Sequence, residues 1–318
     1  MAFELKTGER IRRAVRRIVK NELDDALELL TGEKKESRDE MVHEVRKSFK
    51  KVRAVLRMVR PAIDDATYRT ENICFRDAAR PLTKVRDAKI LVETFDAILN
   101  HFHEHVAGRS FHETHDALQA NLRAIRREVL DEQDAPASIA TIVKDARERV
   151  KEWSDVPNKW RSIGDGVKEV HCRARDAFEA AKDSPSIETL HEWRKQAKYL
   201  RYQLEILRPL WPERLEELAG EADRMTELLG DDHDAAVLRQ KLADDPDKLG
   251  GADAIEALLA IIDRRREELQ QEATLLGGRY FDEPSNEFAR RLKGLWKSFC
   301  TAEEHPTDSR LTGIAAAS

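Results

Sequence analysis

Residues 41–60, MVHEVRKSFKKVRAVLRMVR, decide the fold, because they have the spacing of a long amphipathic helix. Apolar residues recur at steps of three and four positions and predict a single buried stripe made of Val45, Phe49, Val52, Leu56 and Val59. Histidine, arginine and lysine side chains occupy the opposite side. Pro61 predicts the end of the helix, since its ring cannot continue the hydrogen-bond ladder.

The same helix occurs twice in the chain. HEVRKSFK at residues 43–50 returns 148 positions later as HEWRKQAK at 191–198, and the match continues in register to a shared proline, Pro61 and Pro209. The apolar positions drift between the copies, whereas histidine, glutamate, arginine and lysine stay. A constraint from the fold alone would preserve the apolar positions. The repeat therefore predicts a cationic, histidine-containing surface that is presented twice.

Two further segments repeat around these helices. Residues 82–91 align with 229–238 through a leucine, an Asp-Ala pair and two aliphatic residues. Ahead of them, two helix faces share one spacing of basic side chains and imidazole, namely Arg10, Arg13 and Arg17 in the first copy and Lys168, His171 and Arg175 in the second. Duplicated helical units of this length predict an all-α fold of two tandem, pseudo-symmetric four-helix bundles.

The predicted bundles span about residues 1–153 and about 165–300 and together form a single helical domain over 1–300, followed by a flexible tail over 301–318. A cluster of Pro157, Gly164 and Gly166 marks the boundary between them. The chain lacks alternating β-branched runs between tight-turn pairs, so no sheet is expected.

Composition agrees with long helices, because 318 residues contain only 13 glycines and 10 prolines. The formal charge of -5 disfavours a polyanion partner at first sight, but the charge is segregated. Residues 6–20 are strongly basic and residues 213–234 strongly acidic. Three scattered cysteines predict reduced thiols, and the N-terminus lacks an apolar signal core. We therefore expect a cytoplasmic protein without a membrane-spanning segment.

The paired motifs resemble the signature of the CHAD family, the conserved-histidine α-helical domain. The motif His-x-x-Arg-Lys begins both repeated helices, and VRDA at 85–88 and LGDDHD at 229–234 support the resemblance over roughly residues 3–300. The family implies two pseudo-symmetric helical bundles and non-catalytic binding of inorganic polyphosphate along basic surfaces. Carried to this chain, the binding positions are His43, Arg46, Lys47, Lys50, Arg53, Arg57, His191, Arg194, Lys195, Lys198 and Arg201. We add Arg10, Arg13, Arg17, His171 and Arg175 from the third repeated segment.

The chain departs from a strict duplication in its second copy. Glu205 stands at the position of Arg57, and Tyr202 stands at that of Ala54. The second half is thus expected to hold a polymer less tightly, or to flank it with an aromatic ring. Relatives that also carry a triphosphate-hydrolysing domain begin with alternating Glu-x-Glu-x-Lys, of which only Glu4-Leu5-Lys6 is present. We therefore expect no catalytic half.

The basic stripes have a physical cost that a ligand can offset. Like charges three and four residues apart destabilise an isolated helix by about 0.2–0.5 kcal/mol per pair. An anionic polymer would remove this cost, and salt bridges to the acidic helices are the alternative. His43 and His191 lie one turn before Arg46 and Arg194, so we expect them on the cationic face, where a polyanion favours the protonated ring. Neither has the companions of a metal site, and no metal or cofactor is predicted.

For two other groups of titratable residues we expect structural roles rather than metal binding or catalysis. Five histidines between 101 and 115 lack a known metal-binding spacing, and a polar helix end explains them better than a metal site. Asp87 and Asp234 occupy matched positions, and we expect each to orient a basic helix rather than act as a base.

The sequence thus predicts a protein that binds polyphosphate, with both rows of cations converging on one groove. A nucleic-acid binder, a metal-assisted phosphohydrolase and a scaffold for acidic proteins are the alternatives. Targeting to polyphosphate granules, regulation of polymer metabolism and phosphate sensing are all open on the sequence, as are oligomeric state and preferred polymer length.

Overall fold

The computed structural model describes residues 3–104, 111–153, 156–244, 246–249 and 251–304. Within these ranges the chain forms eleven α-helices and no strand, which confirms the predicted all-α class. The helices of the N-terminal half are α1 (Ile11–Leu30), α2 (Arg38–Val59), α3 (Asp65–Ala78), α4 (Arg80–His101), α5 (His112–Arg126) and α6 (Ala135–Arg149). Those of the C-terminal half are α7 (Arg161–Asp183), α8 (Ile187–Leu207), α9 (Pro212–Asp244), α10 (Ala252–Tyr280) and α11 (Ser285–Glu304). None of the described helices combines the length and the apolar character needed to cross a bilayer.

The two repeated helices are α2 and α8, and local signals set their ends. The Ser37 hydroxyl accepts the Glu40 amide at the start of α2, and a reciprocal capping box of Ser186 and Thr189 starts α8. Both helices end in a short 3-10 turn that contains the predicted proline, Pro61 in one and Pro209 in the other.

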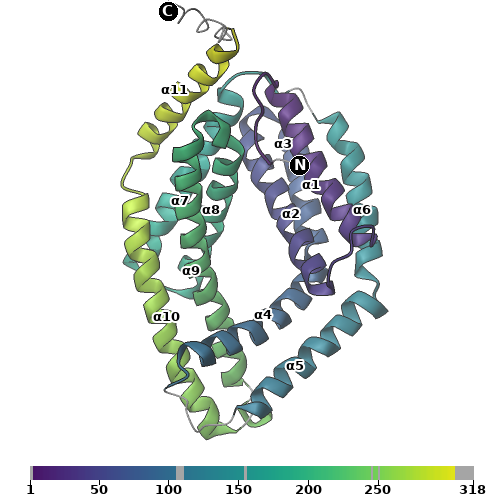
Figure 1. Cartoon of the computed structure of the whole chain (residues 1–318), viewed down its shortest axis with the longest axis vertical. Helices are drawn as coiled ribbons and strands as arrows, with labels where there is room; N and C mark the ends of the chain where they lie inside the picture. The colour runs from purple at the N-terminus through teal and green to yellow at the C-terminus, as the bar shows by residue number, and fades with distance from the viewer. Residues whose placement is uncertain (1–2, 105–110, 154–155, 245, 250, 305–318) are drawn as a thin grey trace, which may run out of the picture.

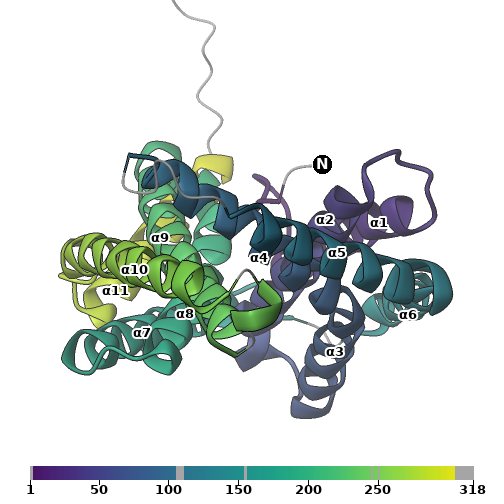
Figure 2. The same cartoon turned by 90° about the horizontal axis from the view of Figure 1, so that it is seen from below.

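The helices are arranged as two groups joined across one end. In Figure 1, α1, α2, α3 and α6 form one side, α7 to α11 form the other, and α4 and α5 run between them. Figure 2, the view from below, shows α4 and α5 reaching toward α9 and α10. The neighbours repeat: α2 packs on α1 and α4, and α8 packs on α7 and α9. In addition, α2 packs directly on α7 and α8, so the repeats meet along the conserved helices.

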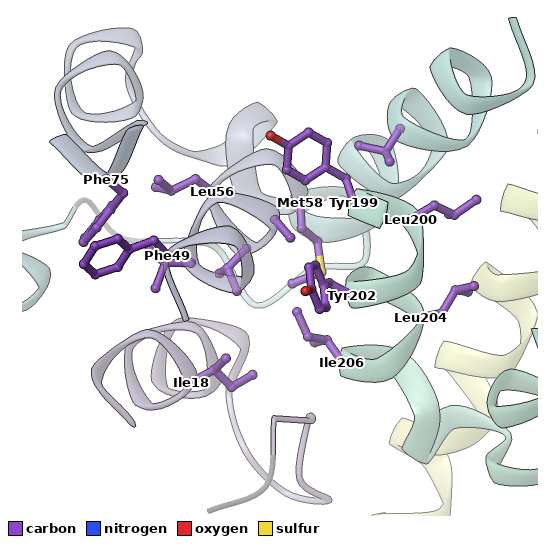
Figure 3. Packing of buried hydrophobic residues seen from close by; sticks show 14 of the residues in the cluster. Ile18, Phe49, Leu56, Met58, Phe75, Tyr199, Leu200, Tyr202, Leu204 and Ile206 are labelled. Carbon is purple, nitrogen blue, oxygen red and sulfur yellow. The ribbon is translucent and has the colours of Figure 1, made fainter. Parts of the chain in front are cut away.

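The hydrophobic core joins the two halves instead of separating them. The larger of two clusters of buried apolar residues runs from α1 and α2 through α7 and α8, and includes Phe49, Met58 and Tyr202. Figure 3 shows Met58 of α2 beside Tyr202 and Ile206 of α8. The smaller cluster draws on α4 and α5 from the first half and on α9 and α10 from the second. Each of the two clusters therefore combines residues from both predicted bundles, 1–153 and 165–300.

Polar contacts also tie the repeats together inside the core. The buried Gln203 amide donates to the Ala54 carbonyl at 3.2 Å, and the Leu5 amide donates to the Ile206 carbonyl at 2.9 Å. Because a buried amide without a partner costs about 1–3 kcal/mol, the Gln203 bond fixes α8 against α2.

Two details of the predicted boundaries change. Gly164 and Gly166, expected at the boundary, lie in the first turns of α7. Their missing side chains let Trp160 and the Met58 carbonyl approach closely. Residues 301–304, expected in a flexible tail, complete α11, and 305–318 lie outside the described residues.

Gly166 supplies a test of the contact between α7 and α2. A Cβ added there would lie 2.1 Å from the Met58 carbonyl oxygen, so backbone would have to move. We expect Gly166→Ala to lower the free energy of unfolding by about 1–3 kcal/mol, measured by urea denaturation followed by circular dichroism. The control is Gly220→Ala in α9, where a Cβ meets nothing within 4 Å and helix propensity predicts a gain of up to about 1 kcal/mol. Equal stability changes for both variants would contradict the close contact.

Candidate functional site

A cavity of about 660 Å³, here called the central cavity, lies between α2, α4, α8 and α9. Cationic and imidazole side chains from both repeated helices line it, namely His43, Arg46, Lys47 and Lys50 of α2 and His191, Arg194, Lys198 and Arg201 of α8. These eight are the larger part of the residues predicted from the two stripes. The structure therefore brings both rows to one place.

The two arginines at the centre of the motifs, Arg46 and Arg194, contact aligned positions of α4 and α9. Arg46 donates to the Thr83 hydroxyl and to the Ala79 carbonyl, both at the start of α4. Arg194 lies against Gly230 of α9, the residue that aligns with Thr83, and a Cβ there would be 2.9 Å from its guanidinium nitrogen. Gly230 thus makes the room that Arg194 occupies. The buried Nε of Arg194 has no hydrogen-bond partner.

The charges of the central cavity repel one another. Burial, with the nearby cations Lys198, Arg46 and Arg194, lowers the pKa of Lys50 to about 6. Burial and the charge of Arg194 likewise lower the pKa of Lys198 to about 8. Among the residues that the structure describes, no carboxylate forms an ion pair with any of these four side chains. Such an arrangement is unfavourable unless an anion enters.

Four of the lining basic side chains do have carboxylate partners, and one of them is Arg86, which binds Glu93 at 3.0 Å. Lys47 binds Glu44 within α2 at 3.0 Å. Arg201 binds Glu205 at 2.9 Å and also Asp223. The Nε2 atom of His43 lies 3.6 Å from Glu44. The unneutralised charge is therefore concentrated on the arginines and lysines in the middle of the two rows.

Both motif histidines border the central cavity, as expected, but in the free protein they are not stabilised as cations. Burial and the charge of Arg86 lower the pKa of His43. Burial and His233, whose ring centroid lies 4.7 Å away, lower the pKa of His191. An anion in the cavity would act in the opposite direction and favour the protonated rings.

Carboxylates also line the cavity, on the side formed by α4 and α9. Burial raises the pKa of Asp87, of Asp231 and of Asp234, while the charges of Arg46 and Arg194 act against that rise. Asp87 and Asp234 face the basic helices at matched positions, and neither makes an ion pair among the described residues. The expected hydrogen bond or salt bridge from a basic helix to each aspartate is thus not found among the described residues.

Sequence reasoning missed two residues of the site, Arg86 and His233, which line the cavity beside the motif histidines. They align with one another in the repeat of residues 82–91 and 229–238. That alignment was a usable signal, because it placed a basic or imidazole group directly before each matched aspartate.

Three residues of the stripes lie outside the central cavity. Lys195 faces solvent and binds Glu192. Arg53 and Arg57 lie further along α2, where both donate to the side-chain oxygen of Asn72 in α3, at 3.0 and 3.3 Å. They belong to two neighbouring cavities and not to the central one.

The basic face of α1 forms a second surface, which we call the α1 surface. It includes Arg10, Arg13 and Arg17 and borders a hollow of about 390 Å³ against α6. Arg17 is engaged inside the protein, since it binds Glu9 at 2.7 Å and the Glu4 carbonyl at 2.8 Å. The three arginines predicted from the spacing of α1 are thus separate from the central cavity.

The prediction for His171 is wrong. Its ring is buried, stacks on Phe288 with a centroid distance of 4.2 Å, and its Nδ1 lies 2.8 Å from the Ser285 hydroxyl. Burial lowers the pKa of His171 to about 4, so it is a neutral core residue. The helical spacing did align it with the basic residues of α7, but α11 covers that face. Arg175, one turn further on, does not line the central cavity.

The cluster of histidines at 101–115 is dispersed. His101 binds Glu268 at 3.0 Å, His115 lies near Asp96, and His105 is outside the described residues. Within the part of the chain that the structure describes, no three His, Cys, Asp or Glu side chains gather closely enough to hold a metal ion.

Lys50 supplies a test of the repulsion in the cavity. Its pKa in the folded protein is about 6, below the ordinary lysine value of 10.5. Between these pH values the unfolded chain binds more protons, so the cost of burying Lys50 grows as the pH falls. We expect Lys50→Met to raise the free energy of unfolding by on the order of 2 kcal/mol at pH 6, and by less at pH 9. Urea denaturation at the two pH values measures this.

The matched control is Lys47→Met, one turn earlier on the same helix. Lys47 is more exposed and paired with Glu44, so its replacement should change stability by no more than about 0.5 kcal/mol. A loss of stability in Lys50→Met at pH 6 would show that Lys50 is not held among like charges.

Comparison with known proteins agrees with this geometry. A solved structure described as PptA from Streptomyces chartreusis matches with a TM-score of 0.60 at 14% sequence identity, over 86% of this chain and 100% of that chain. At this identity the likeness shows the fold alone. No curated protein sequence matches the chain. The sequence pattern of the CHAD domain matches residues 9–243, which contain α2, α4, α8 and nearly all of α9. The chain therefore belongs to the CHAD domain family.

Proposed function

We propose that this protein binds inorganic polyphosphate in the central cavity, without hydrolysing it. One observation carries the proposal: Arg46, Lys50, Arg194 and Lys198, from two copies of one helix, face a common space without carboxylate partners among the described residues. Membership of the CHAD domain family supports the same ligand.

The chemistry of the cations fits phosphate. Each guanidinium offers a planar set of N–H donors that matches two phosphate oxygens, and each ammonium is a movable point charge. A charge-assisted hydrogen bond contributes about 1.5–3 kcal/mol, and more where water is excluded. An anion beside Lys50 and Lys198 favours their charged forms, which burial and the neighbouring cations disfavour in the free protein.

The arrangement favours a polymer over a single phosphate. Cations of α2 and α8, together with Arg86 of α4, line the same space, so several phosphate groups can be held at once. Linked groups bind with a high effective concentration once the first is held. We therefore propose that long polyphosphate binds much more tightly than triphosphate, and that this binding would place the protein on polyphosphate granules.

Charge reversal tests the site. We expect Arg46→Glu combined with Arg194→Glu to weaken binding of long-chain polyphosphate by at least about 100-fold in isothermal titration calorimetry, while circular dichroism stays unchanged. The matched control is Arg161→Glu combined with Arg224→Glu, which reverses two exposed arginines with side-chain exposures of 89% and 55%. Unchanged binding in the first variant would show that the ligand lies elsewhere.

Two further measurements separate this proposal from the alternatives. Duplex DNA, titrated at the same salt concentration, should bind more weakly, and equal or tighter binding would favour a nucleic-acid binder. Incubation of polyphosphate with the protein and magnesium or manganese should release no orthophosphate. Release that is lost in His43→Ala would identify a phosphohydrolase instead.

Binding should take up protons, because the ligand raises pKa values that the free protein lowers. At pH 7 Lys50, with its pKa of about 6, is largely neutral when free and becomes charged beside the polymer. We expect the affinity to fall between pH 6 and pH 9, by up to about tenfold per pH unit for each proton taken up. Calorimetry in buffers with different ionisation enthalpies counts these protons.

The control for proton uptake is Lys50→Arg, which keeps the positive charge but does not titrate in this range. It should flatten the dependence of affinity on pH while preserving tight binding. A pH profile identical to that of the wild type would exclude Lys50 as a group that gains a proton.

A further inference from the structure

Two smaller cavities lie beside the central cavity on the side of the first repeat. The first, here called the side cavity, has a volume of about 350 Å³ and lies between α2, α3 and α4. The second, the end cavity, has a volume of about 310 Å³ and lies where the C-terminal end of α2 meets α3, α7 and α8. The side cavity is lined mainly by basic residues, namely Arg46, Lys50, Arg53, Arg76 and Arg80. The lining of the end cavity is half basic, with Arg57, Arg60, Arg69 and Arg173, and it also includes Glu169, which binds Arg173.

The three cavities follow one another along α2. The central and side cavities share Arg46, Lys50 and Thr83, so these side chains face both spaces. Arg53 of the side cavity and Arg57 of the end cavity are joined through Asn72, whose side-chain oxygen accepts from both. The same face of α2 thus continues from the central cavity to the end of the helix.

Arg53 and Arg57 are available to an anion. Their partners are neutral: Asn72 for both, and for Arg57 also the Arg53 carbonyl and the ring of Tyr199, 3.8 Å below the guanidinium. Among the described residues neither forms an ion pair. Other arginines along the series are already engaged, since Arg76 binds a neighbouring carboxylate at 2.9 Å.

The corresponding route on the second repeat is closed by negative charge. Arg201, the counterpart of Arg53, is bound by Glu205 and by Asp223. Glu205 is itself the counterpart of Arg57. The two halves are therefore alike in the central cavity and opposite in charge immediately beyond it.

We propose that a long polyphosphate chain leaves the central cavity on one side only, along α2 through the side cavity and past Arg53 and Arg57 to the end cavity. This inference rests on the proposed function, and it adds subsites and a direction to it. Arg53 and Arg57 act as binding residues for the part of the polymer that the central cavity cannot contain.

The sharpest test introduces one carboxylate beside Arg53 and Arg57, so that the first repeat resembles the second. Asn72→Asp places a carboxylate between both guanidiniums, as Glu205 and Asp223 do for Arg201. We expect it to weaken binding of long-chain polyphosphate by about tenfold, and to leave the binding of tripolyphosphate in the central cavity unchanged. The slope of log affinity against log salt for the long chain should fall by about one for each arginine that is neutralised.

A second variant protects the test against an unforeseen effect of the new carboxylate. Arg53→Gln combined with Arg57→Gln removes the charges directly and should give the same selective loss for the long chain. The control is Arg10→Gln combined with Arg13→Gln, which removes two charges from the separate α1 surface and should leave both affinities unchanged.

The outcomes distinguish the two proposals. Failure of the wild type to bind either ligand would overturn the proposed function. Binding by the wild type, with no selective loss in Asn72→Asp and in the double glutamine variant, would overturn the route alone. A loss confined to the Arg10 and Arg13 variant would also overturn it, because the extra phosphates would then lie on the α1 surface.

Discussion

The repulsion between buried cations of two repeats is the constraint on which the site depends. Lys50 and Lys198 are held near one another, and near Arg46 and Arg194, in a space where water screens them poorly. A folded protein tolerates such an arrangement only when the rest of the structure is stable enough to impose it. At neutral pH Lys50 avoids most of this repulsion by losing its proton, and an anion in the cavity would favour its charged form again.

The shared hydrophobic core imposes this arrangement of cations. Had each repeat folded around its own core, the two could move apart and relax the repulsion. Instead, one cluster of apolar residues runs from α1 through α8, and Gln203 of α8 is bonded inside it to the backbone of α2. The close approach at Gly166 locks α7 against the same helix. The apolar sides of α2 and α8 are therefore held in one core, and their basic sides line the central cavity.

The sequence predicted the parts of this structure that follow from helix periodicity. The apolar stripe of α2 is buried, the α-helix ends at Val59 just before the 3-10 turn that contains Pro61, and the motif residues Arg46 and Arg194 reach the same cavity. What it missed depends on which helix covers which face. The spacing of His171 matches that of an exposed basic row, but α11 packs over it, and no local signal in α7 announces that contact. Likewise, Arg57 has the spacing of a cavity residue, yet it lines the end cavity, which shares no residue with the central cavity.

The unequal duplication has a consequence for the ligand itself. Polyphosphate has no chemical direction, and its two termini are the same. A protein with an open row of arginines beyond one repeat and Glu205 with Asp223 beyond the other would place those termini in unlike surroundings. The bound polymer would thereby acquire a head and a tail, so that an enzyme working on it could be offered one terminus while the other stays sheltered.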